Sequence, residues 1–268
     1  VIHFAALKSV GESVQQPLRY YQNNLNSLIQ LLHWVEDCRI PHLIFSSSCT
    51  VYGDTDVLPV HEELPFLPTG SPYGRSKQMC EEIIRDFYKD RSTDRKALSL
   101  RYFNPAGAHE SGLMGESPIN PPLNLVPVIT ETAIGRRKDM TVHGSDYSTR
   151  DGSCIRDYVH VMDLARAHTL ALRRLESGDQ KVAVDAINLG MGQGVTVLEA
   201  IHAFEETTGL KLNYHLGPRR PGDLPAVYAD KRKAAQLLGW NPERDIRRIM
   251  SDAWAWEKAR TKGSAGEL

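Results

Sequence analysis

Tyr73 and Lys77 are spaced so that the tyrosine could act as an acid and a base. They stand four residues apart in Ser-Pro-Tyr-Gly-Arg-Ser-Lys, and on a helix this spacing places the ammonium group near the phenol. A free tyrosine titrates near pH 10, so its deprotonation near pH 7 costs about 4 kcal/mol. A fixed positive charge can supply much of this free energy. The same spacing also arises by chance in surface pairs, so the surrounding elements must decide.

The segments around this pair alternate between apolar strands and amphipathic helices. We predict strands over residues 1–5, 42–47 and 97–103, and helices over residues 23–36 and from residue 73 onwards. Strands joined by helices in this order form right-handed βαβ units, so the predicted fold class is α/β with a parallel, Rossmann-like sheet. Ligands bind at the carboxyl ends of such strands, and the second strand ends in Ser46, Ser47 and Ser48.

The pattern changes beyond residue 105, where glycine and proline become frequent. Asp163 is the expected N-cap of a helix, and Thr196 and Glu199 form a capping box for a helix closed by Gly209. A strand over residues 184–189 could return to the main sheet. Further helices are predicted over residues 125–134, 230–238 and 246–259, and further strands over residues 140–143 and 211–216.

The composition is that of an ordinary globular protein. The 268 residues are 41% hydrophobic and 24% charged, with a formal net charge of −1, which indicates neither a nucleic acid nor an anionic membrane as a partner. No apolar run is long enough for a membrane-spanning helix. The four cysteines lack metal-ligand spacing, so we expect no metal site and interpret them as free thiols in a reducing cytoplasm.

Six ordered segments resemble the extended short-chain dehydrogenase/reductase superfamily and, within it, the UDP-glucose 4-epimerase (UDP-galactose 4-epimerase) family. They are residues 1–8, 46–53, 71–77, 101–105, 156–163 and 219–225. The resemblance extends over essentially the whole chain. That family carries a glycine-rich dinucleotide fingerprint upstream of these segments, and this chain contains none. The chain therefore resembles an N-terminally truncated epimerase whose sheet lacks its first strands and which has a smaller mixed α/β substrate-binding lobe.

The resemblance implies reversible interconversion of UDP-glucose and UDP-galactose at C4, through transient hydride transfer to bound NAD, as in galactose metabolism. It implies that Tyr73 takes the proton of the sugar 4-hydroxyl and that Ser48 hydrogen-bonds the same oxygen. Lys77 would hold the nicotinamide ribose and lower the pKa of the tyrosine. These three residues are the expected catalytic residues.

The resemblance also implies two sets of binding residues. The expected NAD-binding residues are Phe4, Ala5, Lys8, Asn23, Ser48, Tyr73, Lys77, Tyr102 and Phe103. The expected UDP-sugar-binding residues are Ser48, Tyr73, Asn104, Asn124, Leu125, Thr141, His143, Arg156, Arg220 and Asp223. Guanidinium groups suit a diphosphate. As alternatives, Phe4 and Phe103 could be plain core residues, and Arg156 and Arg220 could form surface salt bridges.

Two finer expectations concern single side chains. Val227 matches a pocket wall of the family, and its small side chain could leave room for the acetyl group of N-acetylated UDP-hexosamines. His160, between Val159 and Val161, is expected to be a buried structural histidine rather than a catalyst.

The resemblance also predicts how the chain is organised. Residues 1–105, with residues 157–192 returning to them, would be the remainder of the NAD-binding Rossmann domain. Residues 106–156 and 193–262 would form the UDP-sugar-binding lobe. Family members are commonly homodimers joined through helices, and helices over residues 23–36 and 75–90 are the candidates here.

Two alternative functions remain open from the sequence. A nucleotide-sugar dehydratase or decarboxylase would share the fold, but dehydratases resemble Thr-Asp-Glu at the strand end, whereas this chain has Ser48-Cys49-Thr50 without carboxylates. A different class is a non-catalytic remnant that keeps the sheet and cannot bind NAD. Ser48, Tyr73 and Lys77 are all present, which favours the epimerase.

Overall fold

The computed structural model describes residues 1–89, 94–220 and 222–264, with side chains up to residue 261. The chain divides into two compact units, each made of three segments. Unit 1 comprises Val1–Phe103, Arg166–Leu189 and Asp230–Trp240. Unit 2 comprises Asn104–Ala165, Gly190–Ala229 and Asn241–Leu268.

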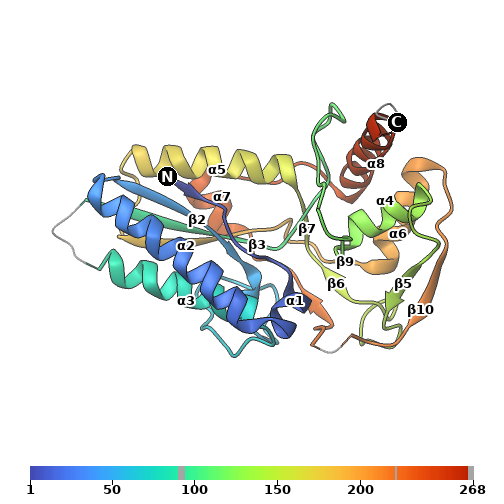
Figure 1. Ribbon diagram of the computed structural model, residues 1–268, viewed down its shortest axis with the longest axis horizontal. Helices are drawn as coiled ribbons and strands as arrows, with labels where there is room; N and C mark the ends of the chain where they lie inside the picture. The colour runs from blue at the N-terminus through green and yellow to red at the C-terminus, as the bar shows by residue number, and fades with distance from the viewer. Residues whose placement is uncertain (90–93, 221, 265–268) are drawn as a thin grey trace. The chain divides into compact units, whose positions relative to one another are not determined.

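Unit 1 is built on a four-stranded parallel sheet with helices on both faces (Figure 1). In spatial order its strands are β1 (Ile2–His3), β2 (His42–Ser48), β3 (Lys96–Tyr102) and β8 (Val184–Leu189). One face is covered by α2 (Pro17–Asp37) and α3 (Pro72–Phe87), and the other by α5 (Val161–Glu176) and α7 (Arg232–Leu238). This arrangement confirms the predicted parallel α/β sheet and the return of residues 184–189 to it.

The core of unit 1 lies between the sheet and helices α2 and α3. Leu28 and Leu32 of α2 pack with Phe45 of β2 and Ile84 of α3, all of them buried. The apolar residues of α2 recur at helical intervals, and this periodicity is the signal that predicted the helix. Packing of these stripes fixes α3 against the strand that ends in the three serines.

Two short elements of unit 1 were not predicted. Helix α1 (Val10–Gln15) lies between the predicted strand over residues 1–5 and the predicted helix over residues 23–36. The Ser9 side chain caps it by accepting a hydrogen bond from the Glu12 N–H. The 3-10 helix η1 (Cys49–Tyr52) follows β2 directly. Helix α2 also starts earlier than predicted, at Pro17, a residue that suits the first turn of a helix.

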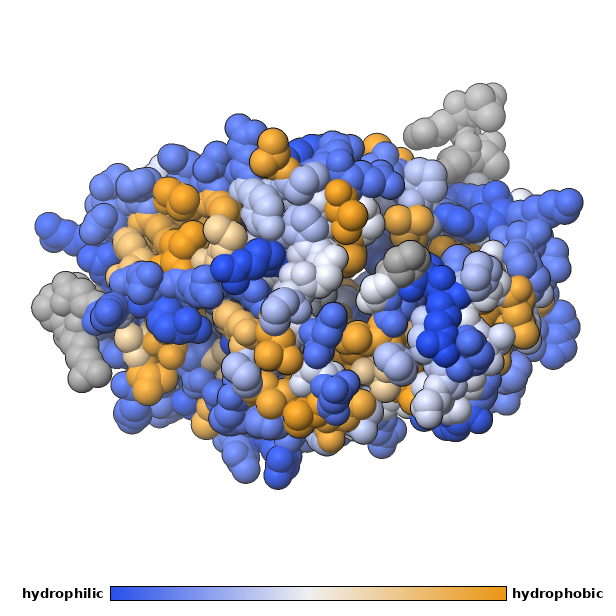
Figure 2. Space-filling model, turned by 90° about the horizontal axis from the view of Figure 1, so that it is seen from below, coloured by the Kyte–Doolittle hydropathy of each residue, from blue (hydrophilic) through white to orange (hydrophobic). Residues whose placement is uncertain are grey.

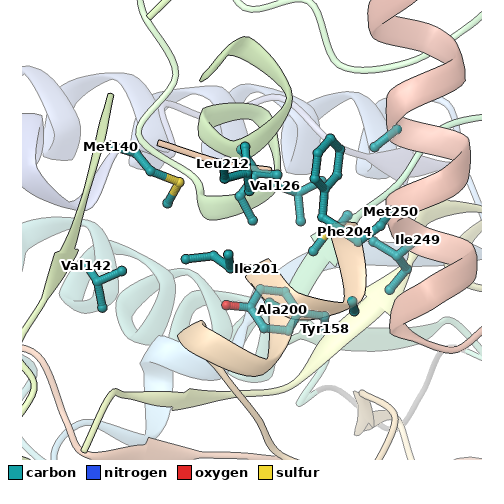
Figure 3. Packing of buried hydrophobic residues seen from close by; sticks show 14 residues of the cluster. Val126, Met140, Val142, Tyr158, Ala200, Ile201, Phe204, Leu212, Ile249 and Met250 are labelled. Atoms are coloured by element: carbon teal, nitrogen blue, oxygen red, sulfur yellow. The ribbon is translucent and has the colours of Figure 1, made fainter. Parts of the chain in front are cut away.

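Unit 2 contains three small sheets and three helices among its described residues. The sheets pair β4 (Asn104–Ala106) with β7 (Tyr158–His160), β5 (Met140–His143) with β10 (Tyr214–Gly217), and β6 (Ile155–Arg156) with β9 (Val195–Thr196) and β11 (Ala226–Val227). The helices are α4 (Leu125–Ala133), α6 (Val197–Thr208) and α8 (Ile246–Ser264). Figure 3 shows Val126, Ile201, Phe204 and Ile249 in their common core.

Of the two helix caps predicted beyond residue 105, one is confirmed and the other is wrong. The capping box of Thr196 and Glu199 opens α6, and Gly209 closes it with a left-handed backbone. Asp163 is not an N-cap, because it lies inside the first turn of α5. Its buried carboxylate instead accepts hydrogen bonds from the N–H groups of Glu243 and Arg244, at 3.0 Å each.

Residues 230–240, which the sequence placed with the second lobe, lie in unit 1. The Asp230 N–H donates to the Val60 carbonyl at 2.7 Å, and Lys233 forms an ion pair with Asp185 of β8 at 2.6 Å. These contacts explain why α7 packs on the main sheet.

All four cysteines are free thiols, as expected. In the part of the chain that the structure describes, none of the helices combines the length and the apolar character needed to cross a membrane.

Candidate active site

The local sequence places Tyr73 and Lys77 beside the end of β2. The Ser71 hydroxyl accepts a hydrogen bond from the Gly74 N–H at 3.2 Å and so caps α3, with Pro72 as its first residue. At Gly74 a side-chain carbon would lie 3.2 Å from the Thr50 carbonyl oxygen. Glycine therefore lets the first turn of α3 approach η1 closely, which brings Tyr73 next to Ser48.

The hydroxyl groups of Ser48 and Tyr73 are hydrogen-bonded to each other. Ser48 is the last residue of β2, and its Oγ also accepts hydrogen bonds from the Thr50 N–H at 3.2 Å and the Thr50 hydroxyl at 3.0 Å. Thr50 thus holds the Ser48 hydroxyl at the end of the strand, where the family resemblance implies that it bonds the oxygen of the sugar 4-hydroxyl.

The expected lowering of the tyrosine pKa by Lys77 is not found. Burial raises the pKa of Tyr73 to about 12, and the hydrogen bond from Ser48 opposes this shift. Burial also lowers the pKa of Lys77 to about 8. Removal from water disfavours the charged form of both groups, and it is the largest cause of both pKa shifts.

The Lys77 ammonium group has two buried neighbours on β2. It donates a hydrogen bond to the Ser46 carbonyl oxygen at 2.7 Å and lies 4.7 Å from the centre of the Phe45 ring. An ammonium group carries three donors, so this arrangement fixes the lysine and leaves it able to bind ligand hydroxyls.

Some of the expected NAD-binding residues are exposed to solvent and others are buried. Phe4, which follows β1, is 62% exposed, and its ring lies tilted against that of His168 of α5, with 5.0 Å between ring centres. Phe4 is therefore not a core residue, whereas Phe103 is buried and donates its N–H to the Leu189 carbonyl. The Tyr102 hydroxyl is hydrogen-bonded to His168 Nε2 at 2.7 Å.

The loop after β1 is held by Asn24, a residue that sequence reasoning missed. Its side chain accepts from the Leu7 N–H at 2.8 Å and donates to the Leu7 carbonyl at 3.1 Å. Asn23, the residue expected at the cofactor, is exposed and donates to Asn24 Oδ1. Ala5 and Lys8 lie exposed on the same loop.

In unit 2, the residues expected to bind a diphosphate meet at one carboxylate. Arg156 Nη2 lies 3.3 Å from Asp223 Oδ1, and Arg220 Nε lies 2.9 Å from Asp223 Oδ2. Arg156 is also held by the carbonyl oxygens of Ile155 and Leu224, at 2.8 Å each. Arg156 and Arg220 therefore do form salt bridges, as the sequence analysis allowed. Both bridges lead to the same carboxylate, so the two guanidinium groups lie at a single acceptor.

The other expected substrate residues of unit 2 are spread over three of its elements. Asn104 begins β4, and its N–H donates to the Asp157 carbonyl. Thr141 and His143 lie on β5, and the remaining two, Asn124 and Leu125, stand at the start of α4. Val227 on β11 pairs directly with Arg156 on β6. His160 is fully buried, as expected, with Nε2 at 3.2 Å from Asp252 Oδ2.

Comparison with known proteins identifies the family. A family model described as GDP-mannose 4,6 dehydratase matches residues 1–253. The chain is 46% identical to UDP-glucose 4-epimerase from Yersinia pestis, over 98% of this chain and 77% of that protein. It is 47% identical to UDP-glucose 4-epimerase 2 from Arabidopsis thaliana, over 96% of this chain and 72% of that protein. The chain belongs to the UDP-glucose 4-epimerase family.

Solved structures of UDP-glucose 4-epimerases have the same fold. The enzyme from Stenotrophomonas maltophila, with bound NAD and formylated UDP-arabinopyranose, matches with a TM-score of 0.94 and 43% identity over 98% of this chain and 77% of that chain. The enzyme from Bifidobacterium longum, in complex with NAD+ and UDP, matches with a TM-score of 0.91 and 45% identity, with the same coverage. These UDP-glucose 4-epimerases confirm the resemblance and the Rossmann-like fold class, and they favour epimerisation over the dehydratase, decarboxylase and non-catalytic alternatives.

Proposed function

We propose that this chain interconverts UDP-glucose and UDP-galactose at C4, with NAD as a bound cofactor, and so links galactose to glucose metabolism. The observation that carries the proposal is the grouping of Ser48, Tyr73 and Lys77 at the carboxyl end of the parallel sheet of unit 1. The solved relatives that contain NAD and UDP or a UDP-sugar support it.

The residues of unit 1 suit a dinucleotide. Lys77 offers a buried, fixed ammonium group for ribose hydroxyls, and the exposed ring of Phe4 offers an apolar surface for a planar ring. When bound, NAD supplies the acceptor for the hydride of C4 and returns it to the other face of the sugar, so there is no net oxidation. We assign the remaining cofactor contacts to Ala5, Lys8, Asn23, Tyr102 and Phe103.

The proton of the 4-hydroxyl is handled by the chain itself. In our proposal the Ser48 hydroxyl accepts the hydrogen bond of the 4-hydroxyl. Tyr73, as its phenolate, takes the proton as the C4 hydride leaves, which yields a 4-keto sugar and a neutral tyrosine. The same tyrosine returns the proton after the sugar has turned. The hydrogen bond between Ser48 and Tyr73 supports this path, because it favours the phenolate form that must arise during the reaction.

We propose that residues of unit 2 bind the nucleotide half of the substrate. We propose that the diphosphate replaces Asp223 as the acceptor of the Arg156 and Arg220 guanidinium groups, and that Asp223 then bonds a ribose hydroxyl. The contact of both arginines with one carboxylate supports this, because a diphosphate presents the same kind of paired oxygens. The further proposed contacts are Asn104, Asn124, Leu125, Thr141 and His143.

The proposal is tested by turnover of UDP-galactose by the chain and by its Tyr73→Phe variant. Loss of a positioned acid and base lowers rates about 10²- to 10⁴-fold, so kcat should fall by at least about 100-fold while UDP affinity stays unchanged. Unchanged turnover would remove Tyr73 from the mechanism. The same assay with UDP-N-acetylgalactosamine tests whether the small Val227 side chain admits acetylated sugars, and no turnover of that sugar would reject this wider range.

We also propose that the protein is a homodimer joined through α2 and α3. Figure 2 views the molecule from the side on which these helices lie, and hydrophobic residues gather on that face. Leu18, Ile29 and Trp34 of α2 are exposed, at 80%, 37% and 64%. An exposed apolar face of this kind marks a protein interface. For the compartment, the four free thiols support a reducing cytoplasm.

A further inference from the structure

Three consecutive serines end β2, and the proposed reaction uses only Ser48. Successive side chains of a strand point to opposite faces of the sheet, so the Ser46 and Ser47 hydroxyl groups face different layers. Both serines are buried, and each hydroxyl is bonded to a different polar network. The two networks reach the catalytic residues from the two faces of the sheet.

Ser46 belongs to the network on the α5 face. Its Oγ is hydrogen-bonded to the Tyr102 hydroxyl at 2.8 Å, and that hydroxyl is also bonded to His168 Nε2 of α5 at 2.7 Å. The carbonyl oxygen of the same serine accepts the hydrogen bond of the Lys77 ammonium group at 2.7 Å. The side chain of Ser46 therefore fixes the peptide group that positions Lys77.

Ser47 belongs to the network on the α3 face. Its hydroxyl donates to Glu81 Oε1 at 2.6 Å. Glu81 also receives hydrogen bonds from Arg101 Nε at 2.9 Å and from Arg101 Nη2 at 2.6 Å, and the two side chains are 3% and 4% exposed. Because Glu81 follows Lys77 by one helical turn and Ser47 precedes Ser48, this bond joins the catalytic turn of α3 to the end of β2.

We propose that Ser46 and Ser47 are positioning residues that hold the end of β2 from both faces of the sheet, so that Ser48, Tyr73 and Lys77 keep their relative places. The proposal rests on the epimerase function proposed above. A single hydrogen bond contributes little to the total stability of a folded chain, whereas a displacement of about 1 Å in a catalytic group can cost about 100-fold in rate. Loss of either hydroxyl should therefore affect rate more than folding.

The test compares Ser46→Ala and Ser47→Ala with a matched control in the full chain. Ser99 is a buried serine of β3 whose hydroxyl has no hydrogen-bond partner among the described residues, so Ser99→Ala is the control. We expect kcat to fall about 10- to 100-fold in the two positioning variants, at unchanged UDP affinity. Ser99→Ala should keep the kcat of the wild type. Ser46→Ala should also retain less NAD through purification, because the peptide group that accepts the Lys77 hydrogen bond loses its side-chain anchor to Tyr102.

A double-mutant cycle separates this role from a general loss of structure. Ser46→Ala and Tyr102→Phe each remove the same hydrogen bond, so their combined effect on kcat should be close to that of the larger single change. Effects that multiply independently would overturn the proposal. The proposal would also be overturned if both serine variants kept the kcat and the NAD content of the wild type. The same holds if Ser99→Ala lost as much kcat and thermal stability as the two positioning variants.

The same data distinguish this proposal from the proposed function. Turnover of UDP-galactose by the wild type tests the epimerase function directly and does not depend on the serine variants. If the wild type turns the sugar over but the variants behave as the wild type does, only the positioning role is rejected. If the wild type shows no turnover, the coupling between Ser46 and Tyr102 is still measured by the amount of NAD retained.

Discussion

At the scale of single residues, burial governs the protonation of Tyr73 and Lys77, the proposed catalytic pair. The phenol of Tyr73 and the ammonium group of Lys77 are both removed from water, and their pKa values move to about 12 and about 8, each toward the neutral form. The Ser48 hydrogen bond is the contribution that favours the phenolate. Burial therefore favours a neutral phenol at Tyr73, which must lose its proton before it can act as a base.

The first prediction concerns this protonation state. Because burial raises the pKa of Tyr73, we expect its phenol to stay protonated at pH 10, where a free tyrosine is about half ionised. The tyrosinate absorbance of the wild type minus that of Tyr73→Phe, recorded during an alkaline titration, measures it. Ser48→Ala removes a hydrogen bond to the phenolate and should raise the pKa of Tyr73 further. Ionisation of Tyr73 below pH 10 would contradict the assignment.

A second prediction concerns two neighbouring arginines with different partners. Arg220 pairs with Asp223, beside Arg156, whereas Arg219 pairs with Asp146 at 2.8 Å. Hydrogen bonds to charged groups contribute about 1.5–3 kcal/mol, so Arg220→Ala should weaken UDP binding about 10- to 100-fold, as measured by calorimetry. Arg219→Ala is the matched control and should leave the affinity unchanged. Equal effects of the two changes would make Arg220 an ordinary surface salt bridge.

At the scale of elements, a buried ion pair joins β3 to α3. Arg101 and Glu81 are almost completely buried, and Arg101 Nη1 also donates to the Tyr52 hydroxyl at 2.9 Å. Such a pair adds little net stability compared with apolar residues, but removal of one partner leaves an uncompensated charge. The Arg101–Glu81 pair instead fixes the position of α3 on the sheet.

This reasoning predicts opposite behaviour of single and double variants. Arg101→Met should lower the free energy of unfolding by about 3–5 kcal/mol, because Glu81 is left buried without its cation, and the added Glu81→Met should restore most of it. Denaturant unfolding of the full chain measures both. Arg19→Met, which breaks an exposed pair with Glu12, should cost less than about 1 kcal/mol. A double variant no more stable than Arg101→Met would show that the charge is not the cause.

At the scale of the whole molecule, the question is how many copies assemble. The exposed apolar residues of α2 occupy the helix face turned away from the core of unit 1, since Leu28, Leu32 and Val35 face inward. A tryptophan such as Trp34 at the centre of an interface often contributes 2 kcal/mol or more to association.

Trp34→Ser should therefore raise the dissociation constant of the proposed dimer by about 30-fold or more. Sedimentation over a range of protein concentrations measures this constant. Val182 is 53% exposed and lies outside α2 and α3, so Val182→Ser is the control and should leave association unchanged. A wild type that sediments as a monomer, or equal effects of both changes, would remove α2 from the interface.

Much of the fold could be read from the sequence because its signals are local. The apolar periodicity of α2 and the capping box of Thr196 and Glu199 depend on neighbouring residues alone, and they predicted these helices correctly. Helix α1 was missed because it is short and its two valines, Val10 and Val14, stay exposed, so that only the Ser9 cap marks it. The role of Asp163 was misjudged because its partners lie some 80 residues away in the chain.

By itself, the sequence determined the family, the parallel sheet and the identity of Ser48, Tyr73 and Lys77, since ordered motifs and helical spacing are properties of the chain. Only the tertiary structure decided the protonation state of that pair and the separate partners of Ser46 and Ser47. Burial acts on a pKa through everything that surrounds a group, and the partners of these serines come from β3, α3 and α5. No spacing along the chain encodes such contacts.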